Sequence, residues 1–175
     1  MIIGMNRLVK LKEKAEILNI LLARSVSYWG FIKKILQFPL ITSSSLLVVL
    51  NSYFKEDEEK MKLVNVVLNG TNVIIMALLN NLSITEKIEN FNSKTLELVE
   101  LVHSIENEMY GTNEDKVELF QEKFDYITKN ILLDAIPSSV KNKVQKEYPH
   151  HSFPLIMGFL SNNNSPNGSL GGDEV

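Results

Sequence analysis

ILQFPLITSSSLLVVLNSYF, residues 35–54, is a run of twenty residues without a charged side chain. A second uncharged run, the twenty-three residues LVNVVLNGTNVIIMALLNNLSIT, covers residues 63–85. The eight residues between them, KEDEEKMK at 55–62, include seven charges. Twenty helical residues extend about 30 Å, which is the thickness of the hydrocarbon core of a bilayer. The pattern therefore predicts two membrane-spanning helices, at about 35–54 and 63–84, joined by a tight polar turn, and it makes the lipid bilayer an expected partner.

The composition of the whole chain narrows the classes of function. Its 175 residues suit one domain. They include no cysteine, which excludes disulfides, thiolate metal sites and a cysteine nucleophile. The formal net charge of −3 gives no overall basic field of the kind that binds nucleic acid. We therefore expect no nucleic acid among the partners.

Before the first run, residues 5–34 have the pattern of an amphipathic helix. Their apolar and small residues recur at alternating steps of three and four, as in a coiled-coil seam. The seam consists of Leu8, Leu11, Ala15, Leu18, Leu22, Ser25, Trp29, Ile32 and Leu36. Seven basic and two acidic residues give the segment a formal charge of +5. Tyr28 and Trp29, followed by Lys33 and Lys34, are typical of a membrane–water boundary. The alternative is a helix of a soluble bundle with Trp29 in its core.

After the second run, the helical pattern continues without a breaker to residue 110, so one helix of about 70 Å is expected from residue 63. Its outer part has a second seam of Ile84, Ile88, Phe91, Thr95, Leu98, Val102, Ile105 and Met109. Residues 86–108 hold six glutamates and two lysines, a formal charge of −4. A membrane hairpin brings this acidic helix beside the basic N-terminal one. We therefore expect an antiparallel coiled-coil stalk, with Leu18 and Leu22 in one seam and Leu98 and Val102 in the other.

Uncharged polar residues form a line along each predicted span. On the first span they are Gln37, Ser44 and Asn51, and on the second they include Asn65, Asn69 and Asn72. These lines predict helix–helix hydrogen bonds in the membrane, within one chain or between copies in a homo-oligomer. The alternative is the wet lining of a pore. Pro39, near the start of the first span, is expected to end or kink its helix.

The C-terminal part of the chain predicts two shorter helices, at about 114–134 and 138–146, separated by Pro137. The last residues, SNNNSPNGSLGGDEV, have a composition typical of an irregular segment. The predicted fold is all-α: a membrane-spanning two-helix hairpin extended by an antiparallel coiled-coil stalk, plus C-terminal helices and an irregular tail. Its parts are the hairpin with its coiled-coil arms at 1–110, the C-terminal helical region at 111–148 and an extended tail at 149–175.

The sequence offers one arrangement that resembles a metal site. Glu97, Glu100 and His103 lie on one predicted helix, and Glu100-x-x-His103 has the spacing found in di-iron helical bundles. Such a site needs a second motif of this kind and two further glutamates on facing helices. A solvated acidic face is therefore the better interpretation. We expect that the chain is not an enzyme and that it has no metal or other cofactor.

The order of these parts resembles the SLATT family of proteins with two transmembrane helices. The resemblance is carried by FPLITSSS in the first span, the short acidic turn, NVVLNGTNVIIMALLNNL in the second span, and the helix EKIENFNSKTLELVELVHSIENEM. It covers about residues 5–110, and it extends to counterparts of the family in large icosahedral DNA viruses. The family's bacterial members imply a pore-forming effector fused to a nucleotide-signalling module, which these residues lack. The viral counterparts imply a membrane component of the virion.

Three hypotheses follow for the function. The first is a structural protein of the inner membrane of a large DNA virus, which contacts capsid proteins through its C-terminal region. The second is a SLATT-like pore that opens on oligomerisation, and the third and weakest is a soluble helical adaptor. Because basic residues stay on the cytosolic side, the +5 of residues 5–34 predicts that both termini face the cytosol and that 55–62 lie on the other side. In a virion the cytosolic side becomes the side that faces the capsid.

Overall fold

In the computed structural model, the described residues are 2–53, 58–109 and 115–149, and within them the chain is helical and has no strand. The helices are α1 (Ile2–Tyr53), α2 (Glu58–Asn81), α3 (Ile84–Glu108), α4 (Asp115–Lys129) and α5 (Ser138–Glu147), together with the 3-10 turn η1 (Leu133–Ala135). The all-α fold class is confirmed. The predicted tail lies outside the described residues from residue 150 onward.

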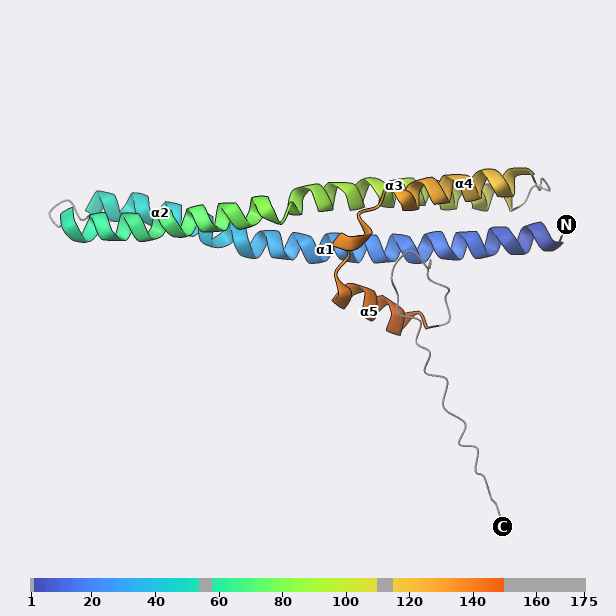
Figure 1. Ribbon diagram of the computed structural model, residues 1–175, viewed down its shortest axis with the longest axis horizontal. Coiled ribbons are helices and arrows are strands. Elements are labelled where there is room, and N and C mark those ends of the chain that lie inside the picture. The colour runs from blue at the N-terminus through green and yellow to red at the C-terminus, as the bar shows by residue number, and fades with distance from the viewer. Residues whose placement is uncertain (1, 54–57, 110–114, 150–175) are drawn as a thin grey trace, which may run out of the picture.

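The molecule is a long rod in which α1 extends from one end to the other (Figure 1). The chain then returns, so that α2 lies beside the C-terminal part of α1 and α3 beside its N-terminal part. The α4 helix lies near the end that holds the N-terminus, and α5 lies beside the middle part of the rod (Figure 1). We call residues 35–53 together with α2 the hairpin. Residues 2–34 together with α3, α4, η1 and α5 are the head.

The buried apolar residues lie in the head. The core joins all four of its helices and consists of Leu8, Leu11, Ala15, Ile17, Leu18, Leu21, Leu22, Phe91, Leu98, Leu101, Ile105, Val117, Phe120, Phe124, Ile127, Ile131, Ile136, Val140 and Val144. Ile17 and Leu21 lie beside the predicted seam of α1, so a packing of α1 with α3 alone would leave them exposed. Both are buried, because α1 also contacts α4 and α5. The arms expected as a two-helix stalk are therefore two members of a four-helix packing, and the segment after residue 114 shares their core.

The α1 helix continues through Pro39 to Tyr53. The expectation that Pro39 ends the helix near the start of the first span is wrong, whereas the alternative, a kink, stays a prediction. Proline removes one backbone donor but not the helical dihedral angles of its neighbours, and apolar spans accommodate it when nearby groups compensate. The basic arm and the first span are consequently one continuous helix.

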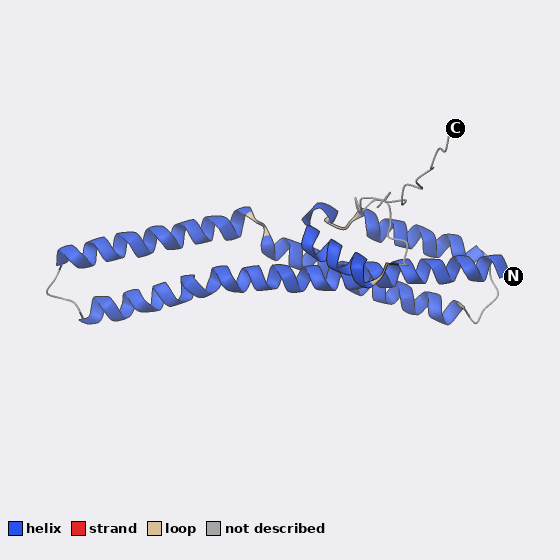
Figure 2. Ribbon diagram, turned by 90° about the horizontal axis from the view of Figure 1, so that it is seen from below, coloured by secondary structure: helices blue, strands red, loops and turns tan. Residues whose placement is uncertain are grey.

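The second long helix, by contrast, is interrupted, so the expected single helix from 63 to 110 is wrong. Figure 2 shows the break between α2 and α3. Ser83 occupies it with a φ of 45° and ψ of 39°, the left-handed conformation that a residue with a side chain rarely adopts. Its N–H donates to the Asn80 carbonyl at 3.1 Å, which closes α2 with a tight turn. Serine leaves no sequence signal of a break as strong as that of glycine or proline.

The segment after α4 also differs from its predicted form. The α4 helix ends at Lys129, earlier than the expected residue 134, and the chain passes through η1 before α5 begins. The Asn90 side chain of α3 holds this turn: its amide N–H donates to the Asn130 carbonyl at 3.1 Å, and its oxygen accepts from the N–H of Leu132 at 3.2 Å. A side-chain amide from another helix thus replaces the backbone bonds that would continue α4.

Candidate membrane-spanning hairpin and its boundary

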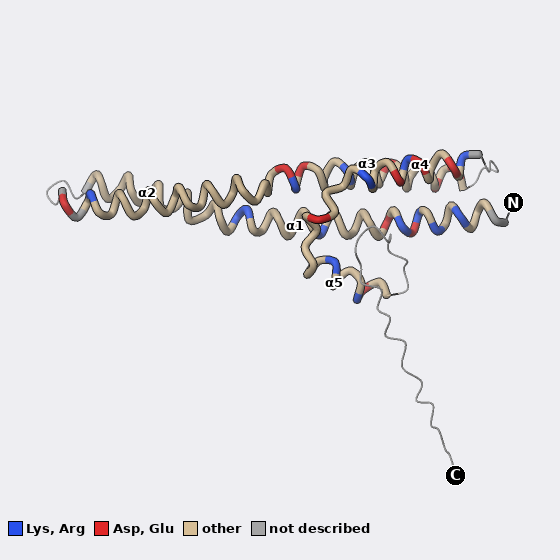
Figure 3. The backbone as a smooth tube through the Cα atoms, viewed as in Figure 1, with Lys and Arg blue, Asp and Glu red and all other residues tan. Residues whose placement is uncertain are grey.

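The outer surface of the hairpin is apolar and uncovered. Two stretches of helix, Gly4–Ser52 and Met61–Glu108, are long and apolar enough to cross a membrane, and none of the residues in their most apolar windows is buried in the structure. Figure 3 shows the charged residues on the head and near the turn of the hairpin, with an uncharged length between them. Apolar side chains at least two-fifths exposed on this length and next to it are Phe31, Ile35, Phe38, Ile41, Leu46, Val48, Val49, Leu63, Val66, Val67, Val73, Ile74, Met76 and Leu78.

The inner surface of the hairpin is a seam of half-buried residues at heptad spacing. On α1 it consists of Leu36, Leu40, Ser43, Leu47 and Leu50, and on α2 of Met61, Asn65, Leu68, Asn72, Ile75 and Leu79. Two side-chain hydrogen bonds cross it. The Ser43 hydroxyl donates to the Asn72 side-chain oxygen at 2.5 Å, and the Asn65 amide donates to the Asn51 side-chain oxygen at 3.3 Å.

The six residues predicted to make contacts in the membrane fall into two groups in the structure. Asn51, Asn65 and Asn72 take part in the two hydrogen bonds that cross the hairpin. Gln37, Ser44 and Asn69 are exposed, and in the described part of the chain they make no hydrogen bond with the other span. For these three a contact with a second copy stays a prediction.

On α1 the hydrogen bond across the hairpin comes from Ser43 and not from the neighbouring Ser44. Ser44 lies one position after Ser43, which turns its side chain about 100° away from the seam, and its hydroxyl donates to the Leu40 carbonyl of its own helix at 2.8 Å. The signal for the correct residue was present in the sequence: Leu22, Trp29 and Leu36 recur every seven residues. The same step continued past Pro39 reaches Ser43.

Aromatic and basic groups meet where the hairpin joins the head. The Trp29 indole N–H donates to the Ala135 carbonyl of η1 at 2.9 Å. The Lys87 ammonium nitrogen lies 4.2 Å from the centre of the Trp29 ring, in a cation–π contact. The Lys33 ammonium donates to the Thr85 hydroxyl at 3.2 Å and so ties α1 to the start of α3. The boundary residues predicted on α1 are therefore joined by Lys87, which the sequence analysis missed because no spacing rule connects it with Trp29.

The residues predicted for the two coiled-coil seams lie in the head. Leu18, Leu22 and Leu98 are fully buried, and Val102 is partly buried against the same core. Their burial follows the heptad positions of the sequence, although α4 and α5 complete the packing around them.

Ion pairs join the helices of the head across its surface. Lys12 of α1 lies 2.7 Å from Glu106 of α3, and this hydrogen bond holds the pKa of the Glu106 carboxyl below its usual range. Arg24 of α1 pairs with Glu147 at the end of α5, where its hydrogen bond lowers the pKa of the glutamate and raises that of the guanidinium. The pairing of basic α1 with acidic α3 agrees with the charges of their sequences.

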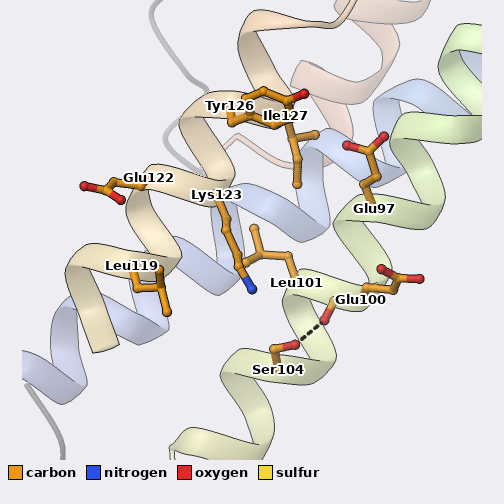
Figure 4. A pocket seen from close by; sticks show the side chains of 9 residues that line it. All are labelled: Glu97, Glu100, Leu101, Ser104, Leu119, Glu122, Lys123, Tyr126 and Ile127. Carbon is orange, nitrogen blue, oxygen red and sulfur yellow. Dashed lines mark hydrogen bonds between the residues drawn. The ribbon is translucent and has the colours of Figure 1, made fainter. Parts of the chain in front are cut away.

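A groove of about 420 Å³ lies between α3 and α4 on the head. Figure 4 shows Glu97 and Glu100 at its α3 side and Glu122 on the outer side of α4, around a floor that includes Leu101. His103 is outside the groove lining and 77% exposed, with its Nδ1 3.4 Å from Glu106. Among the described residues, no group of three or more histidine or acidic side chains is placed to hold a metal ion. Glu97 instead pairs with Lys94 at 2.6 Å.

The fold and its surface define a class: an all-α protein with two long helices apolar enough to cross a membrane, extended on one side by a packed helical head. Comparison of the chain with known protein families, with curated proteins and with solved structures finds no match in any of the three.

Proposed function

We propose that this protein is a structural membrane anchor, in which the hairpin spans a bilayer and holds the head at its surface. One observation carries the proposal: most apolar residues of α1 from Leu8 to Leu22 are buried, whereas most of those from residue 31 to residue 49 are exposed. The exposed apolar side chains of residues 31–49 require apolar surroundings, which a lipid bilayer provides. The part of α1 before residue 23 instead buries its apolar side chains in the core of the head, as a helix does in water. This change along one continuous helix also weighs against the soluble adaptor, whose long helices would be covered.

The orientation that we propose follows from charge. The N-terminal arm carries +5, whereas 55–62 hold three lysines against four acidic residues. Basic residues near a span remain in the cytosol, so the head, with both termini, faces the cytosol and the turn at 55–62 faces the opposite side. Protease added to sealed vesicles should then digest the head and leave the hairpin as a protected fragment. Protection of the head would reverse the orientation.

Within this function we propose a role in a virion: the protein sits in the inner membrane of a large DNA virus as a minor capsid component. The support is the resemblance of residues 5–110 to two-span proteins of such viruses. The head is one packed unit, in which Trp29 and Arg24 attach η1 and α5 to α1. The C-terminal region beyond it would contact capsid proteins and so link the membrane to the shell. Purified virions treated with a short cross-linker should yield adducts between this chain and capsid proteins.

A pore is the second candidate, and one feature of the hairpin favours it. Gln37, Asn69 and Asn80 are exposed amides on the outer surface of the spans. An amide facing lipid is costly, and a second copy could provide its hydrogen bonds. Oligomers built in this way could enclose a polar path. Neither uncharged run has a charged side chain that would attract ions, however. The members of the Ser43–Asn72 and Asn51–Asn65 pairs also bond to each other inside the hairpin, so they do not line a path between copies.

Carbonate extraction and ion flux together test these functions. The full chain, expressed in membranes, should stay in the membrane pellet at alkaline pH, and purified chain in sealed vesicles should carry no ion current. Release into the supernatant would contradict the membrane anchor and favour the soluble adaptor. A robust current from the wild-type protein would contradict the purely structural role and favour the pore.

A further inference from the structure

Three lysine ammonium groups lie at the base of the head, where the exposed apolar surface of the rod begins. Lys33 and Lys34 come from α1, and Lys87 comes from the first turn of α3. The Lys33 ammonium nitrogen is 3.2 Å from the Thr85 hydroxyl oxygen, and that of Lys87 is 4.2 Å from the centre of the Trp29 ring. Lys34 is exposed. Two helices therefore bring positive charge to one level of the molecule.

These lysines differ from the basic residues that hold the head together. Lys12 and Arg24 are each paired with a carboxylate of another helix. Among the residues that the structure describes, none of the three lysines at the base is paired with a carboxylate: the contacts of Lys33 and Lys87 are with a neutral hydroxyl and an aromatic face. Three acidic side chains, Glu86, Glu89 and Asp134, are exposed in the same part of the head and form no ion pair with them. The three positive charges are thus available to an anionic partner.

The expected partner follows from the position of the cluster. In the proposed orientation, the base of the head lies at the level of the phospholipid headgroups, and Trp29 lies among them as indole rings do at membrane interfaces. Anionic headgroups attract lysines near the surface. We propose that Lys33, Lys34 and Lys87 bind anionic phospholipid headgroups, so that the protein selects the phosphate-rich, negatively charged lipid of the leaflet beside its head. This inference rests on the proposed insertion of the hairpin.

Trp29 gives a direct measurement, because it is the only tryptophan of the chain and it touches the cluster. The full-length protein is reconstituted into two sets of vesicles with the same mixture of phosphatidylcholine and phosphatidylglycerol. In one set the phosphatidylcholine carries bromine high on its acyl chain, and in the other the phosphatidylglycerol does. Bromine quenches tryptophan fluorescence on contact. We expect brominated phosphatidylglycerol to quench Trp29 more strongly than brominated phosphatidylcholine does, once each is divided by its mole fraction in the vesicle. Added salt should weaken this preference.

Variants identify the groups responsible. The double substitution Lys33→Gln with Lys34→Gln should reduce the preference for anionic lipid about fivefold per lysine removed. The matched control is Lys10→Gln with Lys14→Gln, which removes two charges from the same helix far from the boundary and should leave the preference unchanged. An equal loss in both variants would show that net charge, and not this cluster, attracts the lipid.

The remaining outcomes separate this inference from the proposed function. Equal quenching by both lipids in the wild-type protein would overturn the lipid preference and leave membrane insertion intact. If neither lipid quenched Trp29 while the protein stayed in the membrane pellet after carbonate extraction, the lipid contact at Trp29 would be overturned; release from the pellet would contradict the insertion itself. Soluble glycerol phosphate provides the third arm: if it abolished the preference at matched ionic strength, the cluster would be a site for a soluble phosphate ester and not for a lipid.

Discussion

The head and the hairpin use the same helix with opposite distributions of apolar surface. In the head, α1 buries Leu18 and Leu22 completely, and charged side chains occupy its outer face. In the hairpin, α1 exposes Phe38 and Val48 by about two-thirds, and its paired face includes Ser43. A heptad seam runs through both regions, so the seam alone does not distinguish them. What distinguishes them is the chemistry of the surface outside the seam.

This difference has a physical origin in the number of partner helices. In the head, α1 contacts α3, α4 and α5, whereas in the hairpin it contacts α2. Two helices cannot bury each other's full circumference, so most of the hairpin surface faces whatever surrounds it. Lipid tails are as apolar as leucine, and therefore the inner face of a hairpin in lipid gains from hydrogen bonds and close packing more than from apolar burial. The Ser43–Asn72 and Asn51–Asn65 contacts fit that requirement.

The largest effect is expected when charge is placed in the core of the head, which should unfold the head and leave the hairpin in place. Leu18→Asp with Leu98→Asp introduces two carboxylates at fully buried positions. Loss of each leucine alone costs about 2–5 kcal/mol, and the buried charges add to this, while a whole domain is stable by about 5–15 kcal/mol. The head should unfold and become sensitive to protease, while the hairpin remains in the membrane pellet.

The control uses the exposed face of the same helices. Met5→Asp with Leu96→Asp adds the same charges to α1 and α3 where the side chains are 56% and 65% exposed, and it should leave the head intact. Retention of full helicity and protease resistance by the Leu18–Leu98 double variant would mean that these residues are not the core of the head in solution.

A second experiment asks whether exposure has the same meaning in the two regions. Val73 in the hairpin and Leu96 in the head are each 65% exposed. Val73→Asp should cost about 2.5–3.5 kcal/mol of insertion free energy, the cost of a charge near the middle of a span. Leu96→Asp should cost almost nothing. Insertion measured with glycosylation sites placed on either side of the hairpin gives both values, and equal tolerance of the two substitutions would place the hairpin in water.

Much of this comparison could be predicted from the sequence, because uncharged runs and heptad spacing are local signals. They located the two long apolar helices, the opposite charges of α1 and α3 and the seam residues of the head. The break at Ser83 could not be predicted, since it depends on a left-handed residue without the glycine that usually marks one. The turn held by Asn90 depends on a contact between residues forty positions apart. On the hairpin, the line of polar residues did not indicate Ser43, which continues the heptad step from Leu36 and bonds to Asn72.

A smaller effect is expected at the polar contacts inside the hairpin. Asn72→Leu removes the partner of Ser43, and such contacts in membranes contribute about 0.6–1.7 kcal/mol. Insertion should improve while the register of the two spans becomes less fixed. Because the chain has no native cysteine, Leu47→Cys with Leu68→Cys, midway between the two polar contacts, reports the register by disulfide formation.

The register experiment has its own control in the same helix. The cross-linking yield should fall in the Asn72→Leu background but not in the Asn69→Leu background, because Asn69 is exposed on the outer surface. An equal fall in both backgrounds would mean that asparagines on either face hold the hairpin, as expected if its copies pair with one another.

The smallest effect concerns the surface of the head, where α5 is attached to α1 by the Arg24–Glu147 pair. The hydrogen bond from Arg24 lowers the pKa of Glu147, so the folded state favours the ionised carboxylate more than the unfolded state does. Its stabilising contribution is therefore present above the ordinary glutamate pKa of about 4.5 and is lost as the pH falls through the lower folded value. Amide exchange in α5, corrected for the intrinsic effect of pH, should accelerate in acid.

Glu147→Gln should show weaker protection already at neutral pH and a smaller further change in acid, whereas Lys146→Gln, one position away, should behave like the wild type. If Glu147→Gln kept the full acid response, the response would come from another pair, of which Lys12–Glu106 is the first to test because the pKa of Glu106 is lowered in the same direction.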